Sequence, residues 1–128
     1  MGAYNAYLEQ RVLTADRLEL VRLSYEALER ALSRAQEAVA VGDLAGEAEA
    51  TGKAVAALAE LAASLNYEEG GEIAQNLGAL YGYMMNRLTQ HMCSASSEAI
   101  DEALAIVRKL REAWDALGER APAARMAA

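Results

Sequence analysis

The sequence contains no phenylalanine, and it has one proline, one cysteine and one histidine. Because the only cysteine is Cys93, no intrachain disulfide can form, and a lone thiol is typical of a reducing compartment. Because the only histidine is His91, the chain cannot supply the two Glu-x-x-His motifs of a di-iron helical bundle. The single proline stands at position 122, so proline interrupts none of the long segments before it.

Positive charge is also scarce. Lysine and arginine number 12 against 19 aspartate and glutamate residues, which gives a net charge of -7 at pH 7. This excess of negative charge argues against nucleic-acid binding and against adsorption to anionic membranes. No apolar run approaches the roughly 20 residues of a membrane-spanning helix, and residues 1–13 lack the pattern of a signal peptide. We therefore expect a cytoplasmic protein with no nucleic-acid partner and no membrane insertion.

Alanine is abundant, within an apolar content of 54%. Alanine is the best helix former, and this apolar content is typical of a globular rather than a disordered chain. A chain of 128 residues is one domain by length. A domain of this size buries roughly two thirds of the surface that its unfolded chain exposes. The composition therefore predicts an all-α domain whose core needs neither a disulfide nor a metal.

The first predicted helix begins after Asp16, a good N-cap with Glu19 three residues later. It ends at Gly42, which suits the position after a helix C-terminus. Its apolar residues follow a spacing of three and four, which is typical of a seam in a helical bundle. This seam consists of Leu18, Val21, Tyr25, Leu28, Leu32, Ala35 and Val39.

The second predicted helix follows Asp43, which can act as its cap, and ends before Asn66. Gly70 and Gly71 can supply the turn that follows, since glycine adopts positive φ without steric cost. We expect the buried seam of this helix to be Leu44, Ala48, Thr51, Val55, Leu58, Ala62 and Leu65. An alanine-rich second seam, where small side chains let another helix approach closely, consists of Ala50, Ala54, Ala57 and Leu61.

The third predicted helix runs from about Glu72 to His91 or Cys93 and carries two neighbouring seams. The first seam is mostly apolar and is expected in the core: Ala74, Leu77, Tyr81, Met84, Leu88 and His91. The second seam mixes apolar and polar groups: Ile73, Asn76, Leu80, Tyr83, Arg87 and Gln90. A helix with two such seams can pack into its own bundle on one side and offer the other side to a partner.

The fourth predicted helix begins after Ser96 or Ser97 and ends at Gly118. Its seam is Ile100, Ala103, Val107, Leu110, Trp114 and Leu117. Four long helices with short connections pack as antiparallel neighbours. We therefore predict an all-α, antiparallel up-down-up-down four-helix bundle over residues 16–118. Residues 1–15 are expected to form an arm or short helix packed on the bundle, and residues 119–128 a frayed tail.

Few residues offer chemistry of their own. His91 could bind haem with Met84 or Met92 as second ligand, which leaves a cofactor-binding or sensor bundle as an alternative function. The simpler interpretation is a partly buried histidine at a helix end. Cys93 has no dyad partner and is expected to be a small packing residue. Gly78 and Gly82 flatten one strip of the third helix, either for close packing inside the bundle or as the floor of a groove. A self-associating structural bundle is a third alternative.

The stretch from Ser64 to Leu88 resembles the signature region of the FliS family, the bacterial flagellin export chaperones. The residues that carry this resemblance are Gly70-Gly71-Glu72-Ile73-Ala74, Asn76-Leu77, Leu80-Tyr81 and Tyr83-Met84, with Asn5-Ala6-Tyr7 and Ala113-Trp114 outside the stretch. Two positions depart from the pattern. Gly82 stands where many members carry an acidic residue, and Arg17 stands where a helix-starting proline is common.

The resemblance implies a cytoplasmic chaperone with no catalytic residues and no cofactor. Such a chaperone binds the disordered C-terminal segment of flagellin, prevents premature polymerisation and supports delivery to the flagellar type III export apparatus. The implied partners are therefore flagellin and the export apparatus, and we expect the free protein to be a monomer.

We expect the partner-binding surface to combine the alanine-rich seam of the second helix with the half-polar seam of the third. Its predicted residues are Ala54, Ala57, Leu61, Ile73, Asn76, Leu80, Tyr83 and Arg87. The arm is apolar for a segment without helical periodicity, so it needs a surface to cover. Tyr7 and Leu8 are therefore predicted to lie over part of the same groove.

Overall fold

The computed structural model describes residues 17–117, which form four α-helices. These helices are α2 (Arg17–Val41), α3 (Leu44–Ala63), α4 (Tyr67–Gln90) and α5 (Glu98–Leu117). The predicted arm at 1–15, the predicted cap at Asp16 and the predicted tail at 119–128 lie outside the described residues. The third helix begins earlier than expected, because a short turn from Tyr67 precedes the expected start near Glu72.

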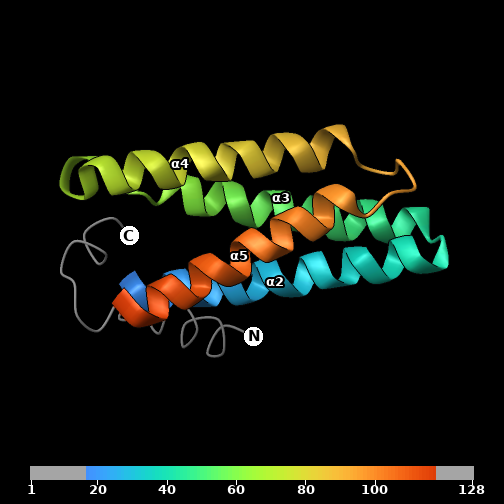
Figure 1. Cartoon of the computed structure of the whole chain (residues 1–128), viewed down its shortest axis with the longest axis horizontal. Coiled ribbons are helices and arrows are strands. Elements are labelled where there is room, and N and C mark those ends of the chain that lie inside the picture. The colour runs from blue at the N-terminus through green and yellow to red at the C-terminus, as the bar shows by residue number, and fades with distance from the viewer. Residues whose placement is uncertain (1–16, 118–128) are drawn as a thin grey trace, which may run out of the picture.

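The four helices alternate in direction and form the predicted all-α bundle (Figure 1). α2 packs along α3 and also against α5, while α4 packs against α3 and touches α5 over a shorter length. Figure 1 shows why: α5 starts near the C-terminal end of α4 and runs obliquely toward the N-terminal end of α2. The contact between α4 and α5 is therefore the least extensive of the four main helix contacts.

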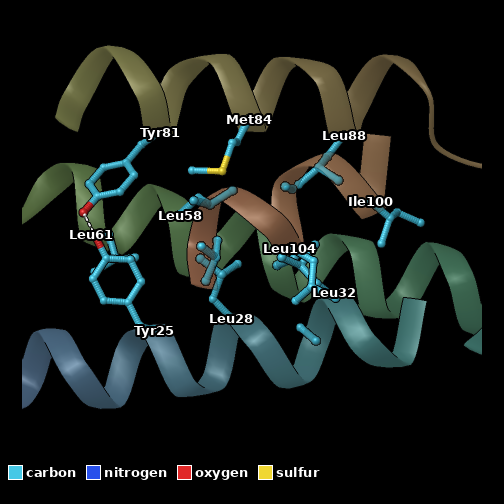
Figure 2. Packing of buried hydrophobic residues seen from close by; sticks show 14 of the residues in the cluster. Tyr25, Leu28, Leu32, Leu58, Leu61, Tyr81, Met84, Leu88, Ile100 and Leu104 are labelled. Carbon is cyan, nitrogen blue, oxygen red and sulfur yellow. Dashed lines mark hydrogen bonds between the residues drawn. The ribbon is translucent and has the colours of Figure 1, made fainter. Parts of the chain in front are cut away.

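The core is formed by the apolar seams that point inward from all four helices (Figure 2). The predicted seams of α2, α4 and α5 are confirmed along most of their length. Their buried members are Val21, Tyr25, Leu28, Leu32, Ala35, Ala74, Leu77, Tyr81, Met84, Leu88, Ile100, Ala103, Val107 and Trp114. Val39 and Leu110 are partly buried, and the side chains of Leu18 and Leu117 lie outside the described ones. His91 departs from the prediction, since it lies exposed at the C-terminal cap of α4.

In α3 the predicted seam was partly wrong. Leu44 is 56% exposed, whereas Ala54 and Leu61 are buried in the core at 0% and 3% exposure. The buried strip lies between the two predicted seams. It consists of Thr51 and Leu58 from the first seam, Ala50, Ala54 and Leu61 from the second, and Glu47 from neither. The reason is that α3 packs against α2 on one side and α4 on the other. The centre of its buried face therefore lies between the two stripes.

The turns follow the residues that the sequence singled out. Gly42 closes α2 with φ at +72°, and paired hydrogen bonds run from Gly42 N–H to Val39 O at 3.2 Å and from Asp43 N–H to Ala38 O at 2.9 Å. The Asp43 side chain then caps α3 by accepting from Gly46 N–H at 2.9 Å. At the start of α4, Gly71 adopts φ +51° and ψ -124°, which kinks the helix after its first turn.

The loop between α4 and α5 is held by a buried carboxylate whose place in the core could not be expected from the sequence. Glu47 is 1% exposed, and its Oε2 accepts a hydrogen bond from Cys93 N–H at 2.7 Å. Cys93 and Ala95 both adopt positive φ, at 59° and 65°. Cys93 itself is exposed, so the prediction that it is a packing residue was wrong. Its backbone N–H and its thiol, which donates to Leu44 O at 3.6 Å, both tie the loop to α3.

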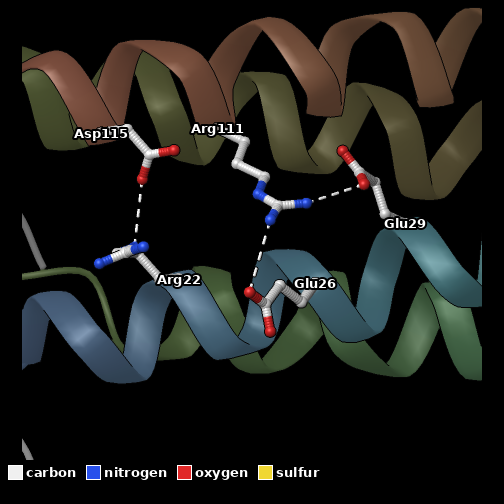
Figure 3. A network of polar contacts seen from close by, with 5 residues as sticks. All are labelled: Arg22, Glu26, Glu29, Arg111 and Asp115. Carbon is white, nitrogen blue, oxygen red and sulfur yellow. Dashed lines mark hydrogen bonds and ion pairs between the residues drawn. The ribbon is translucent and has the colours of Figure 1, made fainter.

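Ion pairs join α5 to α2 along their shared surface (Figure 3). Arg111 contacts Glu29 at 2.9 Å and Glu26 at 3.4 Å, and Arg22 contacts Asp115 at 3.1 Å. These side chains are partly or largely exposed, and exposed ion pairs typically contribute only about 0–1 kcal/mol each. The network therefore adds little to the stability of the bundle.

Three aromatic side chains form a polar contact inside the otherwise apolar core. Trp114 Nε1–H donates to the Tyr25 hydroxyl at 2.9 Å, and the hydroxyls of Tyr25 and Tyr81 lie 2.5 Å apart. Burial, the largest cause, raises the pKa of both phenols above the ordinary value of 10.0. The contact links α2, α4 and α5 at a single point.

The phenol pair predicts a loss of stability at alkaline pH. Because the folded state raises both pKa values, it holds protons that the unfolded chain releases above pH 10 or so. The stabilisation is therefore complete below that pH and falls as the pH rises further. Tyr81→Phe should move the alkaline unfolding midpoint to higher pH, as followed by circular dichroism. Tyr67→Phe, at an exposed position, should leave it unchanged; equal midpoints for all three proteins would contradict the assignment.

Candidate partner-binding surfaces

The outward face of α4 is exposed and carries no charge over most of its length. From Ile73 to Asn86 no residue is charged, although charged residues make up 24% of the chain. Ile73 and Tyr83 are 44% and 46% exposed. Protein interfaces are depleted of charge in their central part and enriched in aromatic residues. This surface, named here the α4 face, consists of Ile73, Asn76, Ala79, Leu80, Gly82 and Tyr83.

The two glycines of α4 lie in different surroundings. A Cβ added to Gly78 would collide with the Tyr67 hydroxyl, so Gly78 provides room for that side chain against α4. A Cβ added to Gly82 would meet nothing within 4 Å. Gly78 therefore serves packing within this chain, while Gly82 leaves a flat, open place on the α4 face.

Polar side chains border the α4 face where α4 meets α5. Tyr83 Oη–H donates to Glu102 Oε1 at 2.8 Å, and Arg87 Nε–H donates to the same oxygen at 3.2 Å. Arg87 Nη1 also lies 3.3 Å from His91 Nε2. The hydrogen bond to Glu102 is the main cause that raises the pKa of Tyr83. These contacts orient the Tyr83 ring without burying it.

A second surface lies between α2 and α3, near the turn that leads into α4. It is a groove of about 880 Å³. Its residues come from the first half of α2, the last turns of α3, the α3–α4 connection and the first turn of α4: Leu20, Val21, Leu23, Ser24, Ala27, Ala57, Glu60, Leu61, Ala63, Ser64, Leu65, Asn66, Tyr67 and Glu68. Leu23 and Tyr67 are 50% and 51% exposed. We refer to it below as the α2–α3 groove.

The structure does not bring the predicted partner-binding residues together in one groove. Ala57 and Leu61 line the α2–α3 groove, while Ala54 is fully buried. The predicted residues of α4 lie elsewhere, on the α4 face and at its border with α5. Tyr7 and Leu8 lie outside the described residues. Leu23 and Tyr67 were not among the predicted partner-binding residues, although the position of Leu23 outside the predicted seam of its helix agrees with its exposure.

His91 lies at the surface rather than at the buried end of the α4 seam, where the haem alternative would need it. Among residues 17–117, no group of three or more histidine, cysteine, aspartate or glutamate side chains is arranged to hold a metal ion. Within the same residues, no helix has the length and apolar character required to span a membrane.

Known proteins resemble this chain along nearly its whole length. The model of the family described as Flagellar protein FliS matches residues 1–121. The flagellar secretion chaperone FliS of Salmonella typhimurium is 34% identical over 115 residues, which cover 89% of this chain and 85% of that protein. The proteins of the same name from Escherichia coli and Bacillus subtilis are 32% and 30% identical, over 84% and 87% of this chain and 79% and 82% of their own length. The chain therefore belongs to the FliS family of flagellar proteins.

Proposed function

We propose that this protein is a cytoplasmic export chaperone that binds the disordered C-terminal segment of flagellin on the α4 face. Membership of a family whose relatives are named flagellar secretion chaperones supports a role in flagellar export. In this proposal the chaperone prevents premature polymerisation of flagellin and supports its delivery to the flagellar export apparatus. No catalytic step is part of the proposed role.

The observation that carries this proposal is the uncharged, exposed surface between Ile73 and Asn86. An exposed apolar patch on a helix commonly marks an interaction site, and the apolar side of an amphipathic helix can pack against it. Gly82 has open space beside it, so a partner backbone can approach α4 closely there. A disordered segment that becomes helical on this face would cover a large surface at moderate affinity.

Tyr83→Glu tests the proposed binding surface. The added charge must be buried when a partner covers the α4 face, so affinity for a flagellin C-terminal peptide should fall at least about tenfold, or about 1.4 kcal/mol. The exposed position of Tyr83 should keep the change in unfolding free energy below about 1 kcal/mol. Isothermal titration calorimetry and chemical denaturation measure the two quantities.

Ala105→Glu is the matched control, because it adds the same charge at an exposed position of α5. It should bind the peptide as tightly as the unmodified protein. If Tyr83→Glu bound the peptide normally, the α4 face would not be the flagellin site. If it lost several kcal/mol of stability instead, Tyr83 would contribute to the core.

We further propose that the N-terminal arm, with Tyr7 and Leu8, covers part of the flagellin-binding surface in the free chaperone and is displaced by flagellin. The basis is the apolar character of a segment without helical periodicity. A covered site lowers the apparent affinity, since only the uncovered fraction can bind. Removal of residues 1–13 should therefore tighten flagellin binding in the same titration. Weaker binding by a shortened but folded chain would show that the arm contacts flagellin directly.

A further inference from the structure

The α2–α3 groove has a chemistry different from that of the α4 face. Its lining includes the small side chains of Ala27 and Ala57 and the buried side chain of Leu61. Leu23 and Tyr67 stand at its edges and are each about half exposed. Side chains of this kind form the core of an interface when a partner covers them.

The charge beside this groove is of one sign. Among the described residues that line it, the charged ones are Glu60 and Glu68. Glu60 belongs to the end of α3, whose last turn contains no basic residue. The C-terminus of a helix carries a partial negative charge that lysine or arginine normally offsets. Among the ion pairs of residues 17–117, none involves Glu60 or Glu68. Glu68 lies in the first turn of α4, where the helix N-terminus favours negative charge. The negative charge that no cation of the described residues offsets is therefore that of Glu60 and the C-terminus of α3.

The dimensions of the groove suit a short helix. Its α2 side extends from Leu20 to Ala27, or about 10 Å at 1.5 Å per residue, which is about two helical turns. Further along the same pair of helices lies a second hollow of about 440 Å³, whose lining includes Arg34 and Lys53 together with Glu37, Asp43 and Glu49. The described lining of the α2–α3 groove carries negative charge alone, whereas that of the second hollow carries both signs. This difference can set the direction in which a basic helix docks.

We propose that the α2–α3 groove binds a short amphipathic helix of a second partner protein, with apolar residues on one face and lysine or arginine beside Glu60 and Glu68. This partner is distinct from the flagellin segment, because the groove and the α4 face share no residues and differ in charge. The chaperone can then hold its cargo on α4 while a basic helix occupies the other surface. A second partner of this kind goes beyond the proposed binding of flagellin.

Two synthetic peptides of about 14 residues, or about four helical turns, test this inference. Both carry leucines with a spacing of three and four, and one ends in two lysines where its twin ends in two glutamates. Fluorescence anisotropy with the full chain should show at least about tenfold tighter binding of the lysine peptide. Leu23→Ser should weaken its binding about tenfold, and the double variant Glu60→Gln, Glu68→Gln should abolish the preference for lysine.

Ile73→Ser on the α4 face is the matched control and should leave the binding of the lysine peptide unchanged. A flagellin C-terminal peptide should not displace the lysine peptide from the unmodified chain. The flagellin peptide is also titrated alone, so that loss of cargo binding and loss of basic-helix binding are recorded separately.

Four results would overturn the inference. The first is equal binding of both peptides, and the second is binding that Leu23→Ser leaves intact. The third is displacement by the flagellin peptide, which would make the groove part of the cargo site. The fourth is binding only by a chain that lacks residues 1–13, which would assign the groove to the chain's own N-terminal segment.

Discussion

Trp114→Ala is expected to lower the free energy of unfolding by about 3–5 kcal/mol, the usual range for removal of a large buried aromatic side chain. Trp114 is 5% exposed and is the largest side chain that α5 contributes to the core. Its indole N–H also donates to the Tyr25 hydroxyl at 2.9 Å. The truncation removes the packing between α5 and α2 and one hydrogen bond of the aromatic contact. Urea denaturation followed by circular dichroism measures the loss.

Trp114→Phe separates packing from hydrogen bonding. Phenylalanine retains most of the buried ring volume but cannot donate to Tyr25, so the expected loss is smaller, on the order of 1 kcal/mol. If both variants lost the same free energy, the hydrogen bond rather than the packing would dominate. If the free energy of unfolding of both variants fell no more than it does for a substitution at an exposed position, the placement of α5 against α2 would be incorrect.

Leu58→Ala is expected to cost about 2–5 kcal/mol, because a buried leucine is replaced by alanine and leaves a cavity. Leu58, a residue of α3, is fully buried in the core of the bundle. The matched variant is Leu44→Ala in the same helix. Leu44 is 56% exposed, so its loss should stay below about 1 kcal/mol. The same denaturation experiment compares the two.

This pair decides which face of α3 is buried. The seam expected from the sequence contains both leucines, and it would assign them similar losses. The structure buries Leu58 and exposes Leu44. Comparable losses for the two variants would therefore support the seam read from the sequence against the register that the structure shows.

The helices of this protein could be predicted from local chemistry. Gly42 and Asp43 end one helix and cap the next in the way that their backbone freedom and side-chain oxygen allow. The core seam of α4 could be predicted because its apolar residues keep an unbroken spacing of three and four, whereas the neighbouring seam includes Asn76, Arg87 and Gln90. Tyr81, Met84 and Leu88 accordingly lie in the core.

The buried face of α3 could not be predicted in the same way. Alanine occupies both of its stripes, so the contrast between a buried and an exposed face is weak in the sequence. Packing against α2 and α4 decided which residues were enclosed, and it buried Glu47 with them. A carboxylate gives no sign of burial in a sequence, because its cost depends on a hydrogen-bond donor supplied by another segment, here the N–H of Cys93.

The two candidate surfaces likewise depend partly on local sequence and partly on helix packing. The sequence by itself determined the four helices, the inward seams of α2, α4 and α5, and the uncharged stretch from Ile73 to Asn86, because each depends on residues close together in the chain. Only the tertiary structure decided that α4 turns this stretch outward, and that Leu23 and Tyr67 border a groove with Glu60 and Glu68. Exposure and the joining of distant residues depend on how helices pack, and helix packing is settled by contacts between segments far apart in the sequence.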